Sequence, residues 1–269
     1  MSDATMSRLA AVFATARSEN RAALIGYLPA GYPSVSGAVA AIKAMLANGV
    51  DAVEIGMPYS DPVMDGGTIQ AAVEASLAAG CTVPDLIESV RATSDGAAIL
   101  VMSYWNPIAR YGVERFASDF AAAGGSGVIT PDLTPEEAGP WIEATSGAGI
   151  DRVFLVAPSS TDTRLALVTS ISSGFVYAAS TMGVTGTRNQ VSGAAQTLVA
   201  RTRAVTDLPI AVGLGVSNAA QAAELAAFAD GVIVGSAFVR LLLDAPDEAA
   251  GAAAVGRLAA ELAEGVRAR

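Results

Sequence analysis

The sequence predicts a (β/α)8 barrel with extra helices at its N- and C-terminal ends, and three observations support this prediction. The chain has 269 residues, close to the roughly 250 of a typical α/β barrel. Eight short apolar segments alternate with helical patterns. These segments are continuous rather than alternating, as is typical of parallel strands covered on both faces. No linker or low-complexity tract interrupts them, so we expect one domain over residues 1–269.

The predicted strands are rich in apolar and β-branched residues and are bounded by Gly, Pro or Asn. They are Ala22–Leu28, Ala52–Gly56, Ala98–Met102, Gly127–Thr130, Arg152–Ala157, Phe175–Ala179, Ile210–Gly213 and Gly231–Val234. The helical patterns between them are Val35–Asn48, Thr68–Ala79, Val113–Ala123, Pro135–Ala144, Asp162–Thr169 and Asn218–Phe228. Two amphipathic segments, Ser7–Ser18 and Glu248–Val266, are predicted to form the extra helices, packed outside the ring.

The segment Asp132–Glu137 is predicted to begin a helix, with Thr134 as its cap and Pro135 at the first helical position. The alternative to a barrel is an open doubly wound sheet, which would place a glycine-rich turn after the first strand. The sequence LPAGYPS at that point lacks the G-x-G-x-x-G spacing, so we favour the closed barrel.

The composition excludes several kinds of catalytic site. The chain has no histidine, so histidine triads, histidine zinc sites and histidine general bases are excluded. Its only lysine, Lys43, falls within a helical pattern, where a Schiff base at a barrel mouth is not expected. The single cysteine, Cys81, can form neither an internal disulfide nor a multi-cysteine metal cluster. We expect no metal site, and carboxylates, tyrosines and backbone amides remain, with a reactive Cys81 as the less favoured alternative.

Charge and hydropathy limit the partners. Sixteen Lys and Arg residues against 26 Asp and Glu residues give a net charge of −10, which argues against a broad nucleic-acid surface. No apolar stretch approaches the roughly 20 residues that a membrane-spanning helix needs. The N-terminal sequence MSDATMSRLAAVF lacks the layout of a secretion signal. We therefore expect a cytoplasmic protein that binds neither nucleic acid nor membranes.

Acidic residues follow the second predicted strand closely. Glu54 lies inside that strand, and burying its charge unpaired against the helix layer would be costly, so we expect it to face the barrel mouth. The alternative is a core ion pair with an arginine. Asp61 and Asp65 follow on a loop rich in Pro and Gly, where either one alone would be an ordinary solvated or turn residue. Near Glu54, however, one of them could share a ligand with it, the two carboxyls having different pKa values.

Three glycine-rich segments at the ends of late strands predict a phosphate site. They contain Gly183, Thr185 and Gly186 after the sixth strand, Gly213 and Gly215 after the seventh, and Gly235 and Ser236 after the eighth. Backbone N–H groups at a helix start can hold an anion without any lysine. Four aromatic residues near strand ends, each alone more typical of a core, together indicate a flat apolar pocket: Tyr27, Tyr104, Trp105 and Tyr177.

Eight segments together resemble the alpha subunit of tryptophan synthase along nearly the whole chain. They are AALIGYLPAGYP, VEIGMPYSDPVMDGGTIQAA, MSYWNPI, ITPDLTPEEA, FLVAPSST, YAASTMGVTGTR, GLGVSN and ADGVIVGSA. The second segment and the GVTG sequence are highly specific, and the others support them. The resemblance implies a lyase that cleaves indole-3-glycerol phosphate to indole and D-glyceraldehyde 3-phosphate in L-tryptophan biosynthesis, through an indolenine tautomer and without a cofactor in this subunit.

The resemblance also implies roles for individual residues. Glu54 would be the acid–base that protonates the released ring carbon and deprotonates the glycerol hydroxyl, and Asp65 would accept a hydrogen bond from the indole N–H group. The positions that match substrate contacts are Tyr27, Met102, Leu155, Tyr177, Thr185, Gly186, Leu214, Gly215, Gly235 and Ser236. Among them, Thr185 matches a loop threonine that closes over the site.

Members of this family pair with a pyridoxal-phosphate-dependent beta subunit, which implies an alpha2beta2 assembly in which indole passes between the subunits. Pro58, Asp61 and Asn106 match interface positions. The chain departs from many relatives at Thr181, where they carry an arginine, so loop closure and its coupling to the partner can differ.

Two other functions are alternatives to this one. A phosphosugar isomerase or epimerase would ordinarily need a lysine, a histidine or a metal, which this sequence does not readily supply. An inactive module that only activates a partner would bind the beta subunit without cleaving the substrate. Indole release, assayed with and without a beta subunit, distinguishes the three.

Overall fold

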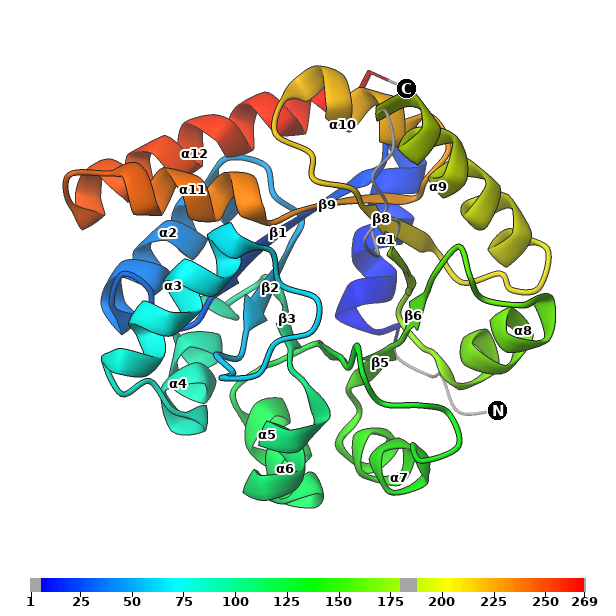
Figure 1. Cartoon of the computed structure of the whole chain (residues 1–269), viewed down its shortest axis with the longest axis horizontal. Helices are drawn as coiled ribbons and strands as arrows, with labels where there is room; N and C mark the ends of the chain where they lie inside the picture. The colour runs from blue at the N-terminus through cyan, green and yellow to red at the C-terminus, as the bar shows by residue number, and fades with distance from the viewer. Residues whose placement is uncertain (1–5, 180–187, 269) are drawn as a thin grey trace.

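The computed structural model describes residues 6–179 and 188–268, and in these the chain forms a ring of parallel strands surrounded by helices (Figure 1). The strands are β1 (Ala23–Pro29), β2 (Ala52–Gly56), β3 (Ala98–Met102), β4 (Gly127–Ile129), β5 (Asp151–Val153), β6 (Leu155–Val156), β7 (Val176–Ala179), β8 (Ile210–Gly213) and β9 (Gly231–Val234). The helices are α1 (Arg8–Ser18), α2 (Val35–Ala47), α3 (Gly67–Ala78), α4 (Val83–Thr93), α5 (Trp105–Tyr111), α6 (Val113–Ala122), α7 (Gly139–Ala148), α8 (Asp162–Ile171), α9 (Arg188–Arg203), α10 (Ala219–Ala226), α11 (Ser236–Asp244) and α12 (Glu248–Gly265).

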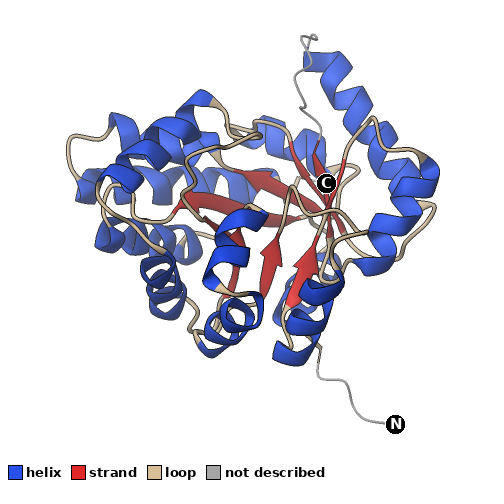
Figure 2. Ribbon diagram, turned by 60° about the horizontal axis from the view of Figure 1, so that its bottom comes forward, coloured by secondary structure: helices blue, strands red, loops and turns tan. Residues whose placement is uncertain are grey.

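The strands pair in the order β5-β4-β3-β2-β1-β9-β8-β7-β6, all parallel. The two ends of this order, β5 and β6, are separated in sequence only by Phe154, so they occupy one strand position and the chain itself closes the ring. The backbone carbonyl of Val153 accepts a bond from Thr130, and that of Phe154 accepts one from Tyr177. The predicted (β/α)8 barrel is thus confirmed, with its fifth strand divided into β5 and β6. Figure 2 shows the strands enclosed by the helices.

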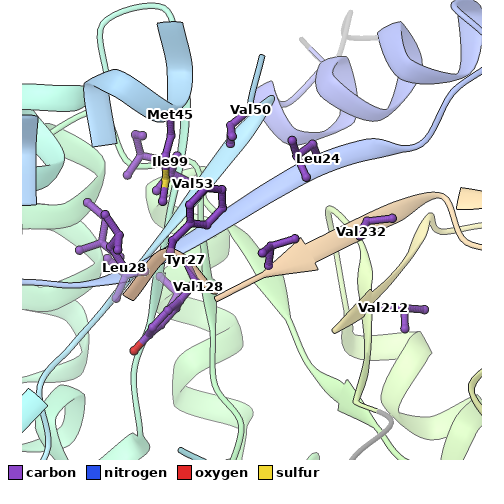
Figure 3. Packing of buried hydrophobic residues seen from close by; sticks show 14 of the residues in the cluster. Leu24, Tyr27, Leu28, Met45, Val50, Val53, Ile99, Val128, Val212 and Val232 are labelled. Atoms are coloured by element: carbon purple, nitrogen blue, oxygen red, sulfur yellow. The ribbon is translucent and has the colours of Figure 1, made fainter. Parts of the chain in front are cut away.

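Alternate residues of each strand face the barrel interior or the helices. The interior holds mainly small and aliphatic side chains, such as Ala23 and Ile25 from β1 and Leu100 from β3. The outward residues pack beneath the helix layer, and Figure 3 shows part of this layer with Leu24, Val53 and Val232. This alternation places every second strand residue, and therefore the functional side chains at the strand ends, inside the ring.

The first helix packs differently from our expectation. We predicted that Ser7–Ser18 would lie outside the ring, whereas α1 buries Leu9, Phe13 and Ala16 in the interior cluster and covers the N-terminal end of the barrel. The rings of Phe13 and Phe175 lie 5.5 Å apart across this end. The C-terminal helix α12 does join the outer layer, where it packs against α2, α10 and α11.

The predicted helix start at Asp132–Glu137 is wrong. These residues form turns, with Glu137 N–H bonded to Thr134 and Ala138 N–H to Pro135, and α7 begins only at Gly139. A helix that began at Pro135 would place Pro140 in its interior, where the ring clashes with a preceding carbonyl and no N–H is available. Pro140 instead occupies the first turn of α7. Four further helices, α4, α5, α9 and α11, were not delimited by the sequence pattern. In the part of the chain that is described, no helix has both the length and the apolarity that crossing a membrane requires.

Candidate active site

A cavity of about 390 Å³ opens at the C-terminal ends of the strands. Its walls come from six strands, β1, β2, β3, β7, β8 and β9, and from the segments that follow β2, β8 and β9. The residues that line it are Tyr27, Glu54, Met64, Asp65, Gly66, Gly67, Thr68, Ile69, Met102, Tyr177, Ala179, Gly213, Leu214, Gly215, Ile233, Gly235 and Ser236. Two of the predicted acids, two of the predicted aromatic residues and the glycines after β8 and β9 therefore meet in one place, whereas Tyr104 and Trp105 do not line this cavity.

Glu54 is the buried acid of this cavity. It lies in β2 with Tyr27 and Leu100 as its register neighbours, and it is 1% exposed. Its Oε1 atom has no hydrogen-bond partner among the described residues. Burial alone raises the pKa of Glu54 to about 8, because the charged form is poorly solvated there. The carboxyl is thus protonated at neutral pH. The alternative, a core ion pair between Glu54 and an arginine, is not supported, because no salt bridge of Glu54 is found among the described side chains.

Asp65 is the second acid, and the loop that carries it is held by two side chains. The hydroxyl oxygen of Tyr104 accepts bonds from the N–H groups of Val63 and Met64, at 3.1 and 3.0 Å. The side-chain amide of Gln70 donates to the backbone carbonyl of Asp65 at 2.7 Å. Asp65 is half-buried, and burial raises the pKa of its carboxyl as well.

Two tyrosines line the cavity, Tyr27 buried and Tyr177 partly buried, and each needs a glycine beside it. A Cβ atom built on Gly56 would lie 2.3 Å from the hydroxyl oxygen of Tyr27, and one built on Gly213 would lie 2.6 Å from that of Tyr177. Burial, with the nearby carboxylates, raises the pKa of both hydroxyls well above the usual value. Both tyrosines therefore stay protonated and can donate hydrogen bonds.

A further part of the cavity lining is suited to an anion. Helix α11 begins at Ser236, so its first backbone N–H groups and the positive end of its dipole lie at the cavity wall, which Gly235 and Ser236 line. Gly215, with φ at +61°, and Leu214 line the same wall from the loop after β8. No described lining residue is a lysine or an arginine, so backbone donors would hold the anion.

The remaining predicted contacts are placed as follows. Met102 lines the cavity, whereas Leu155, the register partner of Tyr177, packs against the interior cluster and is not among the lining residues. Thr185 and Gly186, together with Gly183 and Thr181, lie outside the described residues.

The sequence reasoning missed several lining residues, among them Met64, Gly66, Thr68, Ala179 and Ile233. Those beside Asp65 could have been found from its position in the loop. Ala179 and Ile233 could not, because apolar strand residues carry no signal that separates a cavity wall from a core.

Asp61 faces a different part of the molecule from Asp65. A second cavity, of about 550 Å³, is lined by Tyr59, Ser60, Asp61, Thr82, Val83, Pro84, Asn106, Pro107, Arg110 and Tyr111. Asp61 and Asn106 are exposed there, while Pro58 is buried. We call this second cavity the outer groove. The loop after β2 thus contributes Asp65 to the strand-end cavity and Asp61 to the outer groove.

The other chemically distinctive residues lie away from the strand-end cavity. Lys43 is exposed on α2. Cys81 is partly buried close to Gly31, and burial raises the pKa of its thiol. Across the described residues, no three His, Cys, Asp or Glu side chains are grouped so that they could hold a metal ion.

Comparison with known proteins gives a consistent result. The sequence profile of the tryptophan synthase alpha chain family matches residues 13–267. The tryptophan synthase alpha chain of Thermobifida fusca is 61% identical over 267 residues, covering 98% of this chain and 99% of that protein. That of Streptomyces avermitilis is 58% identical over 274 residues, covering 99% of each chain.

Solved structures agree with the sequence relatives. A structure of Mycobacterium tuberculosis tryptophan synthase superposes with a TM-score of 0.90 at 55% identity and covers 97% of this chain and 98% of that one. The tryptophan synthase alpha subunit of Legionella pneumophila superposes at 0.88 with 28% identity, covering 97% and 99%.

Proposed function

Because the chain belongs to the family of tryptophan synthase alpha chains, we propose that Glu54 and Asp65 are its catalytic pair. The chain is a carbon–carbon lyase of L-tryptophan biosynthesis that cleaves indole-3-glycerol phosphate to indole and D-glyceraldehyde 3-phosphate. The proposal concerns which of its residues carry this reaction and how they do so.

Glu54 moves the proton at the scissile bond. Its pKa of about 8 means that it enters the reaction protonated, and it donates this proton to the indole ring carbon bonded to the glycerol chain. The resulting carboxylate then removes the proton of the adjacent glycerol hydroxyl. As the carbonyl of glyceraldehyde 3-phosphate forms, the carbon–carbon bond breaks, its electron pair returns to the ring, and Glu54 regains its proton.

Asp65 stabilises the charge that the first proton transfer creates. Protonation of the ring carbon places positive charge on the indole nitrogen, and a carboxylate that accepts its N–H bond stabilises that charge. The Tyr104 and Gln70 bonds fix the loop that holds Asp65, so its carboxylate is oriented before the substrate binds. The pair thus divides the work between a buried, protonated acid and a half-buried carboxylate.

The rest of the cavity would bind the substrate. Tyr27, Met102 and Tyr177 provide the walls for the indole ring, and the N-terminus of α11 with Gly215 binds the phosphate. For Leu155, Thr185 and Gly186 the proposal rests on their match to the family alone.

The burial of an unpaired Glu54 in the strand-end cavity is the observation that carries these roles. Glu54→Gln should keep the fold and lower kcat for indole release by about 10²- to 10⁴-fold, the usual contribution of a positioned acid–base. Glu74→Gln, an exposed residue on α3, is the matched control. Normal turnover by the Glu54→Gln enzyme would show that another group moves the proton.

We further propose that the outer groove binds a beta subunit that carries pyridoxal phosphate, in an alpha2beta2 assembly. The chain described here would need no cofactor of its own. The exposure of Asp61 and Asn106 on this groove supports the proposal. Asp61→Ala should weaken the complex without changing the fold, and the mass of the complex in solution tests its stoichiometry. An unchanged dissociation constant would place the interface elsewhere. The cytoplasm is the proposed location, because a phosphate ester substrate does not cross a membrane freely.

A further inference from the structure

One hydrogen bond joins two helices that begin at the strand-end cavity, α3 and α11. The Nη2 atom of Arg240 donates to the hydroxyl of Thr68 at 2.6 Å, joining residues 172 positions apart in the sequence. Arg240 lies on α11, four residues after Ser236, and Thr68 lies in the first turn of α3, three residues after Asp65. Helices α3 and α11 also pack against each other. Both begin at residues that line the cavity, α3 at Gly67 and α11 at Ser236.

We propose that Arg240 is a positioning residue that fixes the separation between the indole end and the phosphate end of the site. The inference rests on the proposed roles of Asp65 and of the α11 N-terminus. The substrate spans these two elements, so a change in their separation affects a ligand that contacts both.

The other contacts that hold the Asp65 loop do not perform this task. Tyr104 and Gln70 attach the loop to the segment after β3 and to α3 itself, and neither reaches α11. Inside the cavity, Tyr27 packs against the α11 side, since a Cβ atom on Gly235 would lie 3.3 Å from its ring. This contact does not join α11 to α3, whereas the Arg240 bond does.

Arg240 is exposed and Thr68 is partly buried, so this bond should contribute little to the stability of the fold. Its value lies in geometry. A ligand that contacts both sides benefits from their being held in place beforehand, whereas a ligand that contacts one side does not. This difference separates a positioning role from a merely structural one.

The test measures binding of the whole substrate and of its halves by calorimetry. In a Glu54→Gln background, where turnover should be about 10²- to 10⁴-fold slower, Arg240→Met should raise the dissociation constant of indole-3-glycerol phosphate by about 3- to 10-fold, the range expected for one lost hydrogen bond. The dissociation constants of glycerol 3-phosphate and of indole should change by less than about 2-fold.

Further variants assign the effect to the bond. Thr68→Val should reproduce the Arg240→Met effect, and the double variant should add little more, because both remove one interaction. Arg240→Lys and Thr68→Ser keep a donor and an acceptor and should restore part of the affinity. Arg91→Met, on α4, removes an exposed arginine with a local partner and is the control.

Equal losses for glycerol 3-phosphate and the whole substrate would overturn the proposal, because Arg240 would then act on the phosphate through its charge. Unchanged binding of the whole substrate, or additive effects of the two substitutions, would overturn it as well. Failure of the Glu54→Gln parent to bind indole-3-glycerol phosphate would instead overturn the proposed site.

Discussion

A glutamate between Val53 and Ile55 in a buried strand is costly in its charged form, and this cost is measurable. Its ordinary pKa is 4.5, and burial raises the folded-state pKa to about 8. Between these pH values the folded protein binds one proton more than the unfolded chain. Stability contributed by Glu54 is therefore fully present below about pH 4.5 and is lost as pH rises through 8.

Glu54→Gln should consequently stabilise the protein at high pH. The variant and the natural protein should be about equally stable at pH 4.5, and at pH 9 the variant should be more stable by on the order of several kcal/mol. Urea unfolding at a series of pH values measures this difference. If the two curves stay parallel from pH 4.5 to 9, the carboxyl is not desolvated in the folded state.

Gly213 gives a second prediction at this scale. Gly213→Ala would place its methyl group 2.6 Å from the Tyr177 hydroxyl oxygen, while the next ring atom lies at 3.2 Å. The substitution should displace the ring and weaken substrate binding by about 10-fold or more. Adding Tyr177→Phe removes the clashing oxygen and should restore much of the affinity.

Gly56→Ala provides the contrast to this rescue. There the ring carbons of Tyr27 would also lie within 2.7 Å of the new methyl group, so Tyr27→Phe should not restore binding. Equal rescue in both pairs, or none in either, would show that these glycines do not make room for the tyrosines.

The sequence alone identified the acids but not these packing relations. Glu54 could be found because a carboxylate inside an apolar strand has few places to go. The dependence of Tyr177 on Gly213 could not, because the two residues lie on neighbouring strands and their ring-to-backbone contact depends on the register between β7 and β8.

At the scale of the elements, the strands were more predictable than the helices. Parallel strands buried on both faces carry a strong local signal, and all eight strand positions fall where the apolar segments predicted them. The start of α7 was missed because a favourable cap at Thr134 competes with Pro140 five residues after Pro135. The position of α1 depends on the open end of the finished barrel, which no local pattern encodes.

The interior face of α1 should be important for stability. Phe13→Ala removes a ring that packs on Phe175 and fills the N-terminal end of the barrel, and should lower the free energy of unfolding by about 3–5 kcal/mol. Thr15→Ala, an exposed position on the same helix, is the control. Equal stability of the two variants in urea would show that α1 does not contribute to the core.

For the whole molecule, we predict that residues 1–269 unfold as one unit. Because β5 and β6 are consecutive in the chain and close the ring, every strand position has a paired neighbour on each side. Separating one strand from the ring therefore breaks its pairing with both neighbours. Fluorescence of Trp105 and Trp141, on α5 and α7, and far-ultraviolet circular dichroism should therefore give coincident urea transitions. Two separate transitions would indicate independently folding parts.

Helix α1, which covers the N-terminal end of the barrel, also limits how substrate and products reach the cavity. Among the described residues, the buried side chains of Leu9, Phe13 and Phe175 lie on the axis at that end, beneath the strand-end cavity. Reactant and products should therefore pass at the strand ends, so the loops that follow the strands, and not the barrel axis, control access to the acids.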